Sequence, residues 1–289
     1  MAQVISIINL KGGVGKTTIT VALAEFLAVE HQKRVLVIDL DPQTNSTVAL
    51  IGEEEWERRN KNDQTLHTLF KDHIDDTCNF EMEKSIVRKS SNLRGGLVNL
   101  HVLPSSLDFV KIQDRLIHIW QTALIRPYDV LKNAVKNHLD DYDYVLIDCP
   151  PNLGIVTQNG LNISHWYLIP TIPDHLSTYG IPQIISSVKN FNRKKEDGDV
   201  KLLGVVASMY RSTVNRHNNT LRQLSLQVEK GELPRLFETR IPLASKASDA
   251  AYYDVDGINT LKQKYGYSTE NLYASFQSLT EELISYAQN

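Results

Sequence analysis

Short runs of apolar, often β-branched residues recur along the chain, and longer stretches with helical spacing separate them. These runs are apolar at consecutive positions instead of alternating with polar ones, which is typical of strands buried on both faces of a parallel sheet. The runs cover residues 4–8, 35–38, 98–103, 144–147, 166–169, 202–207 and 236–241.

The stretches between these runs predict helices over residues 17–30, 105–119, 127–139, 182–192 and 213–230. Alternating strands and helices are typical of an α/β fold, here a doubly wound, mostly parallel twisted sheet of about seven to eight strands flanked by helices. No Gly-, Ser- or Pro-rich linker divides the chain, so we expect one domain over residues 1–289.

One segment departs from this alternation. Residues 53–63 are mostly charged, with both signs, and the chain shows no strong strand signal from there to Gly96. We expect a charged, mostly helical insert at about residues 52–96. Two interpretations stay open for this insert: a solvated helical excursion, or an element that contacts a partner or a second subunit.

Composition narrows the class of protein. The chain has 289 residues, of which 42% are hydrophobic, enough for a folded core. No apolar run reaches the roughly 18 residues of a membrane span, and no signal peptide is visible, so we expect a cytoplasmic protein. Two cysteines, Cys78 and Cys149, cannot build a disulfide framework. The net charge of −3 argues against a single subunit that holds nucleic acid alone.

A glycine-rich loop follows the first apolar run and precedes the first predicted helix. Its glycines let backbone N–H groups turn inward, Lys16 adds a positive charge, and the Thr17 hydroxyl is placed for Mg²⁺. The ordinary phosphate-loop pattern needs glycine at position 10, where this chain has Leu10, and a second lysine, Lys11, stands at the front of the loop. The predicted phosphate-binding residues are Lys11, Gly12, Gly13, Val14, Gly15, Lys16, Thr17 and Thr18.

Acidic residues follow two other predicted strands. Asp39 and Asp41 come after residues 35–38, and Asp148 comes after residues 144–147. Since the carboxyl ends of parallel strands share one edge, where ligands bind, these side chains should converge on the phosphate loop. Mg²⁺ prefers hard oxygen ligands, so we assign a metal site to Thr17, Asp39 and Asp148.

These motifs resemble the deviant Walker A ATPases of the ParA and MinD group. The resemblance rests on residues 11–18, 39–43 and 145–151, and extends through 103–106, 169–171, 205–210 and 239–242, which leaves only about residues 52–96 uncovered. It implies a P-loop NTPase that uses ATP and Mg²⁺ and forms a sandwich homodimer with ATP. In that dimer Lys11 reaches the phosphates bound by the other subunit, Lys16 binds phosphate, Asp41 positions or activates the attacking water, and Asp148 supports Mg²⁺.

The resemblance also places Met209, Arg211 and Pro242 near adenine, although Leu243 follows where relatives often have arginine. Its remaining implication is a ParA-type ATPase that associates with the nucleoid by binding DNA without regard to sequence. Such an ATPase segregates or positions a plasmid, a chromosome or another large cargo such as a carboxysome, and a ParB-like or cargo adaptor protein stimulates hydrolysis. The alternative is a P-loop metabolic ligase or kinase that acts on a small molecule.

The C-terminal segment excludes other roles. Residues 271–288 show an apolar stripe at helical spacing and carry no lysine or arginine, so the stripe should face the core and not a membrane. We expect the tyrosines near the C-terminus to be core and rim residues.

Candidate DNA contacts are the basic residues Arg88, Lys89, Arg94, Arg193, Lys194, Lys195, Arg216, Arg222, Lys262 and Lys264.

Overall fold

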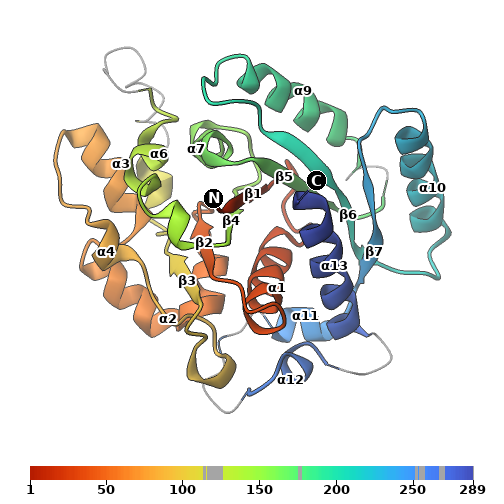
Figure 1. Ribbon diagram of the computed structural model, residues 1–289, viewed down its shortest axis with the longest axis horizontal. Coiled ribbons are helices and arrows are strands. Elements are labelled where there is room, and N and C mark those ends of the chain that lie inside the picture. Colours follow the sequence, from red (N-terminus) through yellow and green to blue (C-terminus); the bar gives the residue numbers. More distant parts are fainter. Residues whose placement is uncertain are drawn as a thin grey trace.

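The computed structural model describes residues 1–112, 115, 126–174, 178–250, 253, 258–266 and 271–288. Its strands form one seven-stranded sheet in the order β3-β2-β4-β1-β5-β6-β7, and every pairing in it is parallel (Figure 1). The prediction of a parallel sheet is confirmed. The strands are β1 (Gln3–Ile7), β2 (Val35–Asp39), β3 (Leu100–Leu103), β4 (Tyr144–Asp148), β5 (Trp166–Thr171), β6 (Lys201–Tyr210) and β7 (Leu236–Pro242).

Helices cover both faces of the sheet, which explains why most of its strands are apolar at consecutive positions. The expected consecutive apolar run is wrong for β7, an edge strand in which Glu238 and Arg240 are exposed. In Figure 1, α1 (Lys16–Val29) and α13 (Leu272–Ala287) lie on one face, and α6 (Val130–Val135), α7 (Ile155–Ile163) and α9 (Ile181–Asn192) lie on the other. The remaining elements are α2 (Asn45–Lys61), α3 (Leu66–Asp75), α4 (Met82–Ser85), η1 (Leu93–Gly95), η2 (Leu139–Asp141), α10 (Asn215–Glu229), α11 (Ser245–Asp249) and α12 (Leu261–Tyr265).

Three helices differ from their prediction. The helix expected at 127–139 shortens to α6, and the one expected at 105–119 begins only at Phe109, with much of it outside the described residues. Helix α7 was not predicted, because its sequence holds Asn and Gly, which are poor helix formers. Tertiary packing decides that helix: a Cβ on Gly160 would come within 3.0 Å of Leu40 and 3.2 Å of Ile147, so glycine allows α7 to lie close to the sheet.

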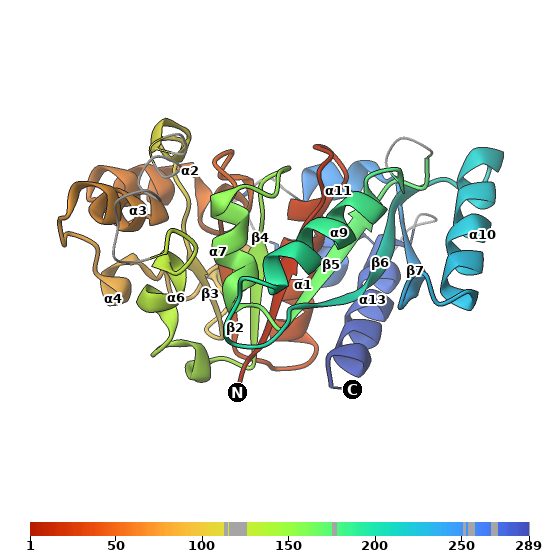
Figure 2. The same cartoon turned by 90° about the horizontal axis from the view of Figure 1, so that it is seen from above.

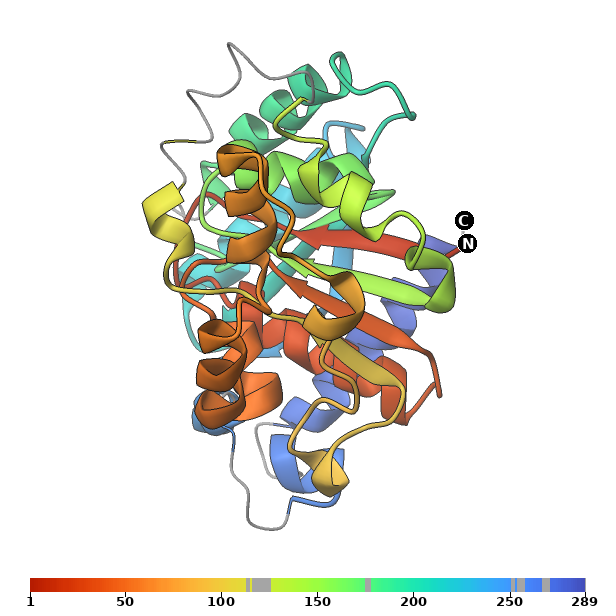
Figure 3. The same ribbon diagram turned by 90° about the vertical axis from the view of Figure 1, so that its left-hand side faces the viewer.

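The predicted insert contains helices but is not uniformly solvated. Figure 3 shows α2, α3 and α4 together at the β3 end of the sheet. Helix α2 kinks at Gly52, whose φ is 78°, and its second half is largely exposed. Helix α3 instead buries Leu66 and Phe70, and the Phe70 ring lies edge-on to Phe109 with 4.9 Å between centroids. The insert therefore joins the core through α3.

The C-terminal helix packs as predicted. Phe276, Leu279 and Leu283 of α13 are fully buried, and the Phe276 ring lies 6.2 Å from that of Phe26 in α1. Figure 2 shows both chain termini at the same end of the molecule, opposite the edge where the strands end. Within the described residues, no helix is both long and apolar enough to span a bilayer.

Candidate nucleotide and magnesium site

The glycine-rich loop connects β1 to α1, and its shape depends on two glycines. Gly13 and Gly15 have φ of 69° and 83°, a left-handed conformation that side chains with a Cβ rarely adopt. Lys16 is buried, with its Nζ 3.5 Å from the Lys11 carbonyl oxygen. The Ser208 hydroxyl of β6 donates a 2.7 Å hydrogen bond to the Val14 carbonyl and so ties the loop to the sheet.

The acidic residues converge as predicted, because β2 and β4 are neighbours and Asp39 is paired in register with Asp148. Asp148 Oδ2 accepts hydrogen bonds from the hydroxyls of Thr17 (2.7 Å) and Ser46 (2.6 Å). Asp148 Oδ1 is buried and has no hydrogen-bond partner in the structure. The phosphate loop, the β4 carboxylate and the start of α2 thus meet at one point.

Burial shifts the titration of these carboxyls. Burial raises the pKa of Asp148 to about 6, and it raises the pKa of Asp39 well above the usual value, with the neighbouring Asp148 charge adding to the effect. The pKa of Asp41 is also raised by burial. A cluster of buried carboxyls that resist ionisation is a candidate functional site, because a bound cation would favour the charged forms.

The chemistry of these groups fits Mg²⁺. The orphaned Asp148 Oδ1 and the Thr17 hydroxyl are oxygen donors beside the phosphate loop, which suits a hard cation that keeps waters and nucleotide oxygens as its other ligands. In the part of the chain that the structure describes, no group of three or more His, Cys, Asp or Glu side chains forms a self-contained metal site. A cation here would need the nucleotide to complete its coordination.

Asp39 is placed differently from the other predicted metal ligands. Its Oδ2 accepts from the Thr47 backbone N–H (2.9 Å) and hydroxyl (2.7 Å), and its Oδ1 accepts from the Asp41 N–H (3.0 Å). Asp39 Oδ2 therefore holds the first turn of α2 and Oδ1 holds the connecting segment that carries Asp41. The arrangement favours a positioning role for Asp39 over direct ligation.

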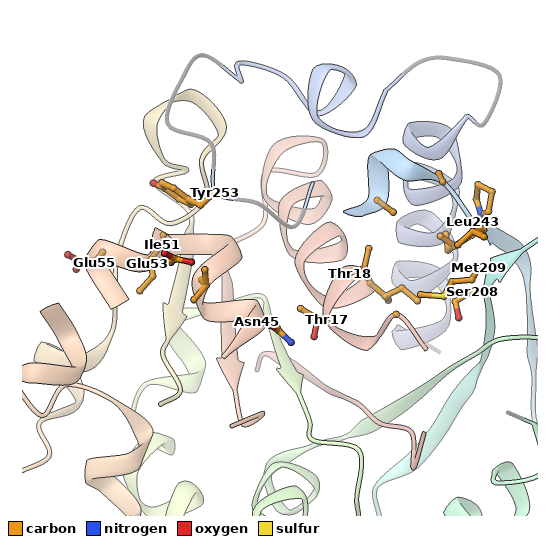
Figure 4. Close-up of a pocket in the computed structure, with 18 of the residues that line it drawn as sticks. Thr17, Thr18, Asn45, Ile51, Glu53, Glu55, Ser208, Met209, Leu243 and Tyr253 are labelled. Atoms are coloured by element: carbon orange, nitrogen blue, oxygen red, sulfur yellow. The ribbon is translucent and has the colours of Figure 1, made fainter. Parts of the chain in front are cut away.

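A cavity of about 1270 Å³ opens beside the phosphate loop (Figure 4). Thr17 and Thr18 lie between two walls in this view, with Ser208, Met209 and Leu243 on one side and Ile51, Glu53 and Tyr253 on the other. Of the predicted adenine contacts, Met209 and Pro242 line the cavity, whereas Arg211 is exposed and not part of its lining. Met209 has φ of 49°, the left-handed conformation again.

The candidate DNA contacts divide into exposed and buried residues. Arg193, Arg216, Arg222 and Lys262 are exposed, whereas Lys195 is half-buried and donates to the Ser164 carbonyl. The prediction that Lys264 contacts DNA is wrong, because its side chain is fully buried and its Nζ lies 2.7 Å from Glu25 Oε1. A buried lysine paired with a carboxylate cannot contact DNA.

Four polar side chains of the site went unnoticed in the sequence. Asn9 donates from Nδ2 to the Pro170 carbonyl (2.7 Å) and accepts from the Lys11 N–H (2.9 Å), so it joins β5 to the phosphate loop. Ser46, Thr47 and Ser208 support Asp148, Asp39 and Val14. Asn9 and Ser208 each come directly after a predicted strand, at the edge of the sheet where ligands bind. That position could have identified them from the sequence.

The AAA domain family model matches residues 2–201. The chain is 30% identical to the sporulation initiation inhibitor protein Soj of Bacillus subtilis over 86% of this chain and 88% of Soj. It is 27% identical to the chromosome partitioning protein ParA of Myxococcus xanthus, over 86% of this chain and 78% of that protein.

A solved structure resembles the fold as well. Cobyrinic acid a,c-diamide synthase from Mycobacterium smegmatis with bound ADP and magnesium superposes with a TM-score of 0.68. It is 29% identical in sequence and covers 88% of this chain and 91% of that one. A nucleotide and magnesium therefore occupy a protein with the same arrangement of strands and helices.

Proposed function

Because the chain belongs to the AAA domain family and, within it, to the ParA family, we propose that it is an ATP-driven switch that positions a large cargo. In this proposal, ATP and Mg²⁺ bring two subunits together as a sandwich dimer, and the dimer binds DNA of the nucleoid without regard to sequence. A ParB-like or cargo adaptor protein stimulates hydrolysis and releases the dimer. The cargo is a plasmid, a chromosome or another large body such as a carboxysome.

ATP and Mg²⁺ are the cofactors of this fold, and the observation that carries the assignment is the Asp148 carboxylate. Its Oδ2 is held by Thr17 and Ser46 while its Oδ1 is buried with no partner, directly beside the phosphate loop. Burying an unsatisfied carboxylate oxygen costs free energy, which a cation bound with the nucleotide would recover. Bound Mg²⁺ would neutralise charge that develops on the phosphates.

The residues of this chain divide the remaining work. Backbone N–H groups of residues 12–16 and the N-terminal end of α1 bind phosphate, and Lys16 adds its charge. Asp41 is 7% exposed, and its Oδ1 accepts from the Gln43 N–H (2.9 Å), which fixes the carboxylate. Because burial raises the pKa of Asp41, this side chain is a better proton acceptor than an ordinary aspartate, and we assign it the attacking water.

Lys11 completes the proposed site from the other subunit. Its side chain is 42% exposed and lies at the front of the loop, whereas Lys16 is buried within it. Phosphoryl transfer depends mainly on positioning and on charge stabilisation, so a cation supplied across an interface makes hydrolysis depend on assembly. Lys11, Lys16 and Asp41 are therefore the catalytic residues that we propose.

The test is the oligomeric state of the protein and its affinity for DNA. With ATP and Mg²⁺, light scattering should find a dimer, and its affinity for random-sequence DNA should fall steeply with salt. Lys16→Ala should lose nucleotide binding and remain a monomer, while Asp41→Ala should dimerise and stay on DNA because it cannot hydrolyse ATP. A wild-type protein that stays monomeric with ATP, or whose DNA binding is indifferent to salt, would contradict the proposal.

The similarity to cobyrinic acid a,c-diamide synthase supports a second candidate, a ligase or kinase that acts on a small molecule. The cavity beside the loop extends past Thr17 to Glu53 and Tyr253, which leaves space for a second substrate. This candidate predicts ATP turnover that rises with a small-molecule substrate and does not respond to DNA. Turnover measured with DNA, with an adaptor protein and with a metabolite pool distinguishes the two functions.

A further inference from the structure

The side chain of Lys11 is not directed freely into solvent. Its Nζ lies 3.6 Å from Asp174 Oδ2, and the two side chains are 42% and 27% exposed. Asp174 follows β5, which is the neighbour of β1 in the sheet, so both partners emerge from adjacent strands. The lysine that we expect to act on the other subunit is thus paired with a carboxylate of its own.

The backbone around both residues is fixed. The Asp174 N–H donates to the Ile172 carbonyl (2.7 Å), and the Asp174 carbonyl accepts from the N–H (3.1 Å) and the hydroxyl (2.9 Å) of Thr178. On the other side, Asn9 holds the Lys11 N–H and is itself bonded to Pro170 at the end of β5. The pair therefore joins two anchored backbones, and only the lysine side chain is long enough to swing away.

We propose that Asp174 is a latch, which keeps Lys11 within its own subunit until ATP-driven pairing draws the lysine across the interface. The inference rests on the proposed function, because it requires Lys11 to leave Asp174 for a partner's phosphates. One ammonium group cannot serve both sites. A half-exposed ion pair is weak, and a triphosphate carries more negative charge than one carboxylate, so nucleotide in the facing subunit wins the competition.

The latch sets a threshold for assembly. Each subunit must break its own Lys11–Asp174 pair, so the two free-energy costs add and both raise the dimer dissociation constant. Exposed pairs of this kind contribute roughly 0.2–1 kcal/mol each, and two of them convert to a change of about 2- to 30-fold. The pair would therefore restrain dimers at low ATP or low protein concentration without preventing them.

Asp174→Asn tests the latch, because it removes the charge and keeps the size of the side chain. We expect the variant to dimerise with ATP and Mg²⁺ at a protein concentration about 2- to 30-fold lower than the wild type, as measured by sedimentation. Its turnover in the absence of any partner should rise at protein concentrations below the wild-type dimerisation midpoint. High salt should reduce the difference, since it screens the ion pair in the wild type.

Two controls isolate the Lys11–Asp174 contact. The Lys71–Asp75 pair of α3 has nearly the same geometry, 3.4 Å with side chains 47% and 29% exposed, so Asp75→Asn removes a comparable surface charge that also bonds Arg115. Asp75→Asn should leave the dimer constant unchanged. In a Lys11→Gln background, Asp174→Asn should have no effect on dimerisation, because nothing remains to be released.

The outcomes are distinct. If the wild type dimerises with ATP and Asp174→Asn dimerises equally or more weakly, the latch is overturned and the proposed function stands. The same holds if Asp174→Asn strengthens the dimer equally well without Lys11. If the wild type does not dimerise at any ATP concentration, the proposed function fails, and the latch fails with it.

Discussion

Two regions of the molecule that bury carboxylates, the contact between α1 and α12 and the edge of the sheet at the phosphate loop, satisfy them in opposite ways. Glu25 of α1 is fully buried, with Lys264 Nζ 2.7 Å from its Oε1 and the Tyr265 hydroxyl 2.7 Å from its Oε2. The Ser91 hydroxyl also donates to Oε1, and Lys264 donates to Asn92 Oδ1 (3.0 Å). Every oxygen of this carboxylate is satisfied by the protein itself.

The edge of the sheet at the phosphate loop buries Asp39 and Asp148 without a cation of their own. In the ranges that the structure covers, hydroxyl and backbone groups bond these carboxylates, but no lysine or arginine forms an ion pair with either. A buried carboxylate with all its partners within the chain is structural, whereas the buried Asp148, whose Oδ1 has no hydrogen-bond partner, indicates a ligand. The difference separates the scaffold from the site.

The largest effect should come from breaking the satisfied pair. Lys264→Met leaves Glu25 buried without its cation and should lower the free energy of unfolding by about 3–5 kcal/mol, measured by urea denaturation. The exposed neighbour Lys262 is the matched control, and Lys262→Met should cost no more than about 1 kcal/mol. Adding Glu25→Gln to Lys264→Met should recover part of the loss. If Lys264→Met lowers the free energy of unfolding no more than Lys262→Met does, the Glu25–Lys264 pair is not a structural element.

Removing a charge at the edge of the sheet beside the phosphate loop should affect ligand binding and not folding. Asp148→Asn keeps the shape and removes a charge that the apo protein does not neutralise, so stability should change by less than about 1 kcal/mol. Nucleotide affinity in the presence of Mg²⁺ should fall by roughly 10- to 100-fold, while affinity measured with EDTA should change little. Calorimetric titrations with and without Mg²⁺ would measure both. Equal losses in the two conditions would exclude a metal role for Asp148.

The carboxyl of Asp148 should also make the stability of the metal-free protein depend on pH. The pKa of Asp148 is raised to about 6, so between its ordinary value near 4 and pH 6 the folded state binds more protons than the unfolded one. The contribution of Asp148 to stability is therefore full at low pH and is lost as the pH rises through 6. Melting curves of wild type and Asp148→Asn with EDTA should diverge across this window. A constant difference between the two proteins would show that Asp148 does not titrate there.

The smallest effect concerns a hydroxyl of the site. Ser46→Ala removes one of the two hydroxyls that donate to Asp148 Oδ2 and should cost about 1 kcal/mol of stability, because a hydrogen bond to a buried carboxylate is lost. The loss of a donor that favours the charged form should also raise the pKa of Asp148 further. The pH range over which the stability depends on Asp148 should therefore move to higher pH. If Ser46→Ala shifts the window to lower pH, this bond does not stabilise the charged form of Asp148.

Much of the site could be read from local sequence. The Gly13 and Gly15 turn, the lysine and threonine that follow, and an aspartate directly after each of two strands are local patterns, and the rule that parallel strands end at one edge brings them together. Most of the strands could also be identified, because burial on both faces leaves a continuous apolar run, whereas β7 contains the exposed Glu238 and Arg240. Asn9 and Ser208 follow the same rule, since each comes directly after a predicted strand.

Other features depend on contacts between distant parts of the chain. Lys262 and Lys264 look alike in the sequence, yet only the packing of α12 under α1 buries Lys264 beside Glu25, 239 positions away. Helix α7 forms where propensity disfavours it, because Gly160 fits against Leu40 and Ile147. The pairing of Lys11 with Asp174 requires β1 and β5 to be neighbours. The sequence by itself determined the sheet, the loop and its acids, since these follow from local periodicity and spacing. The tertiary structure decided which charges are paired, since a charge finds its partner through space and not along the chain.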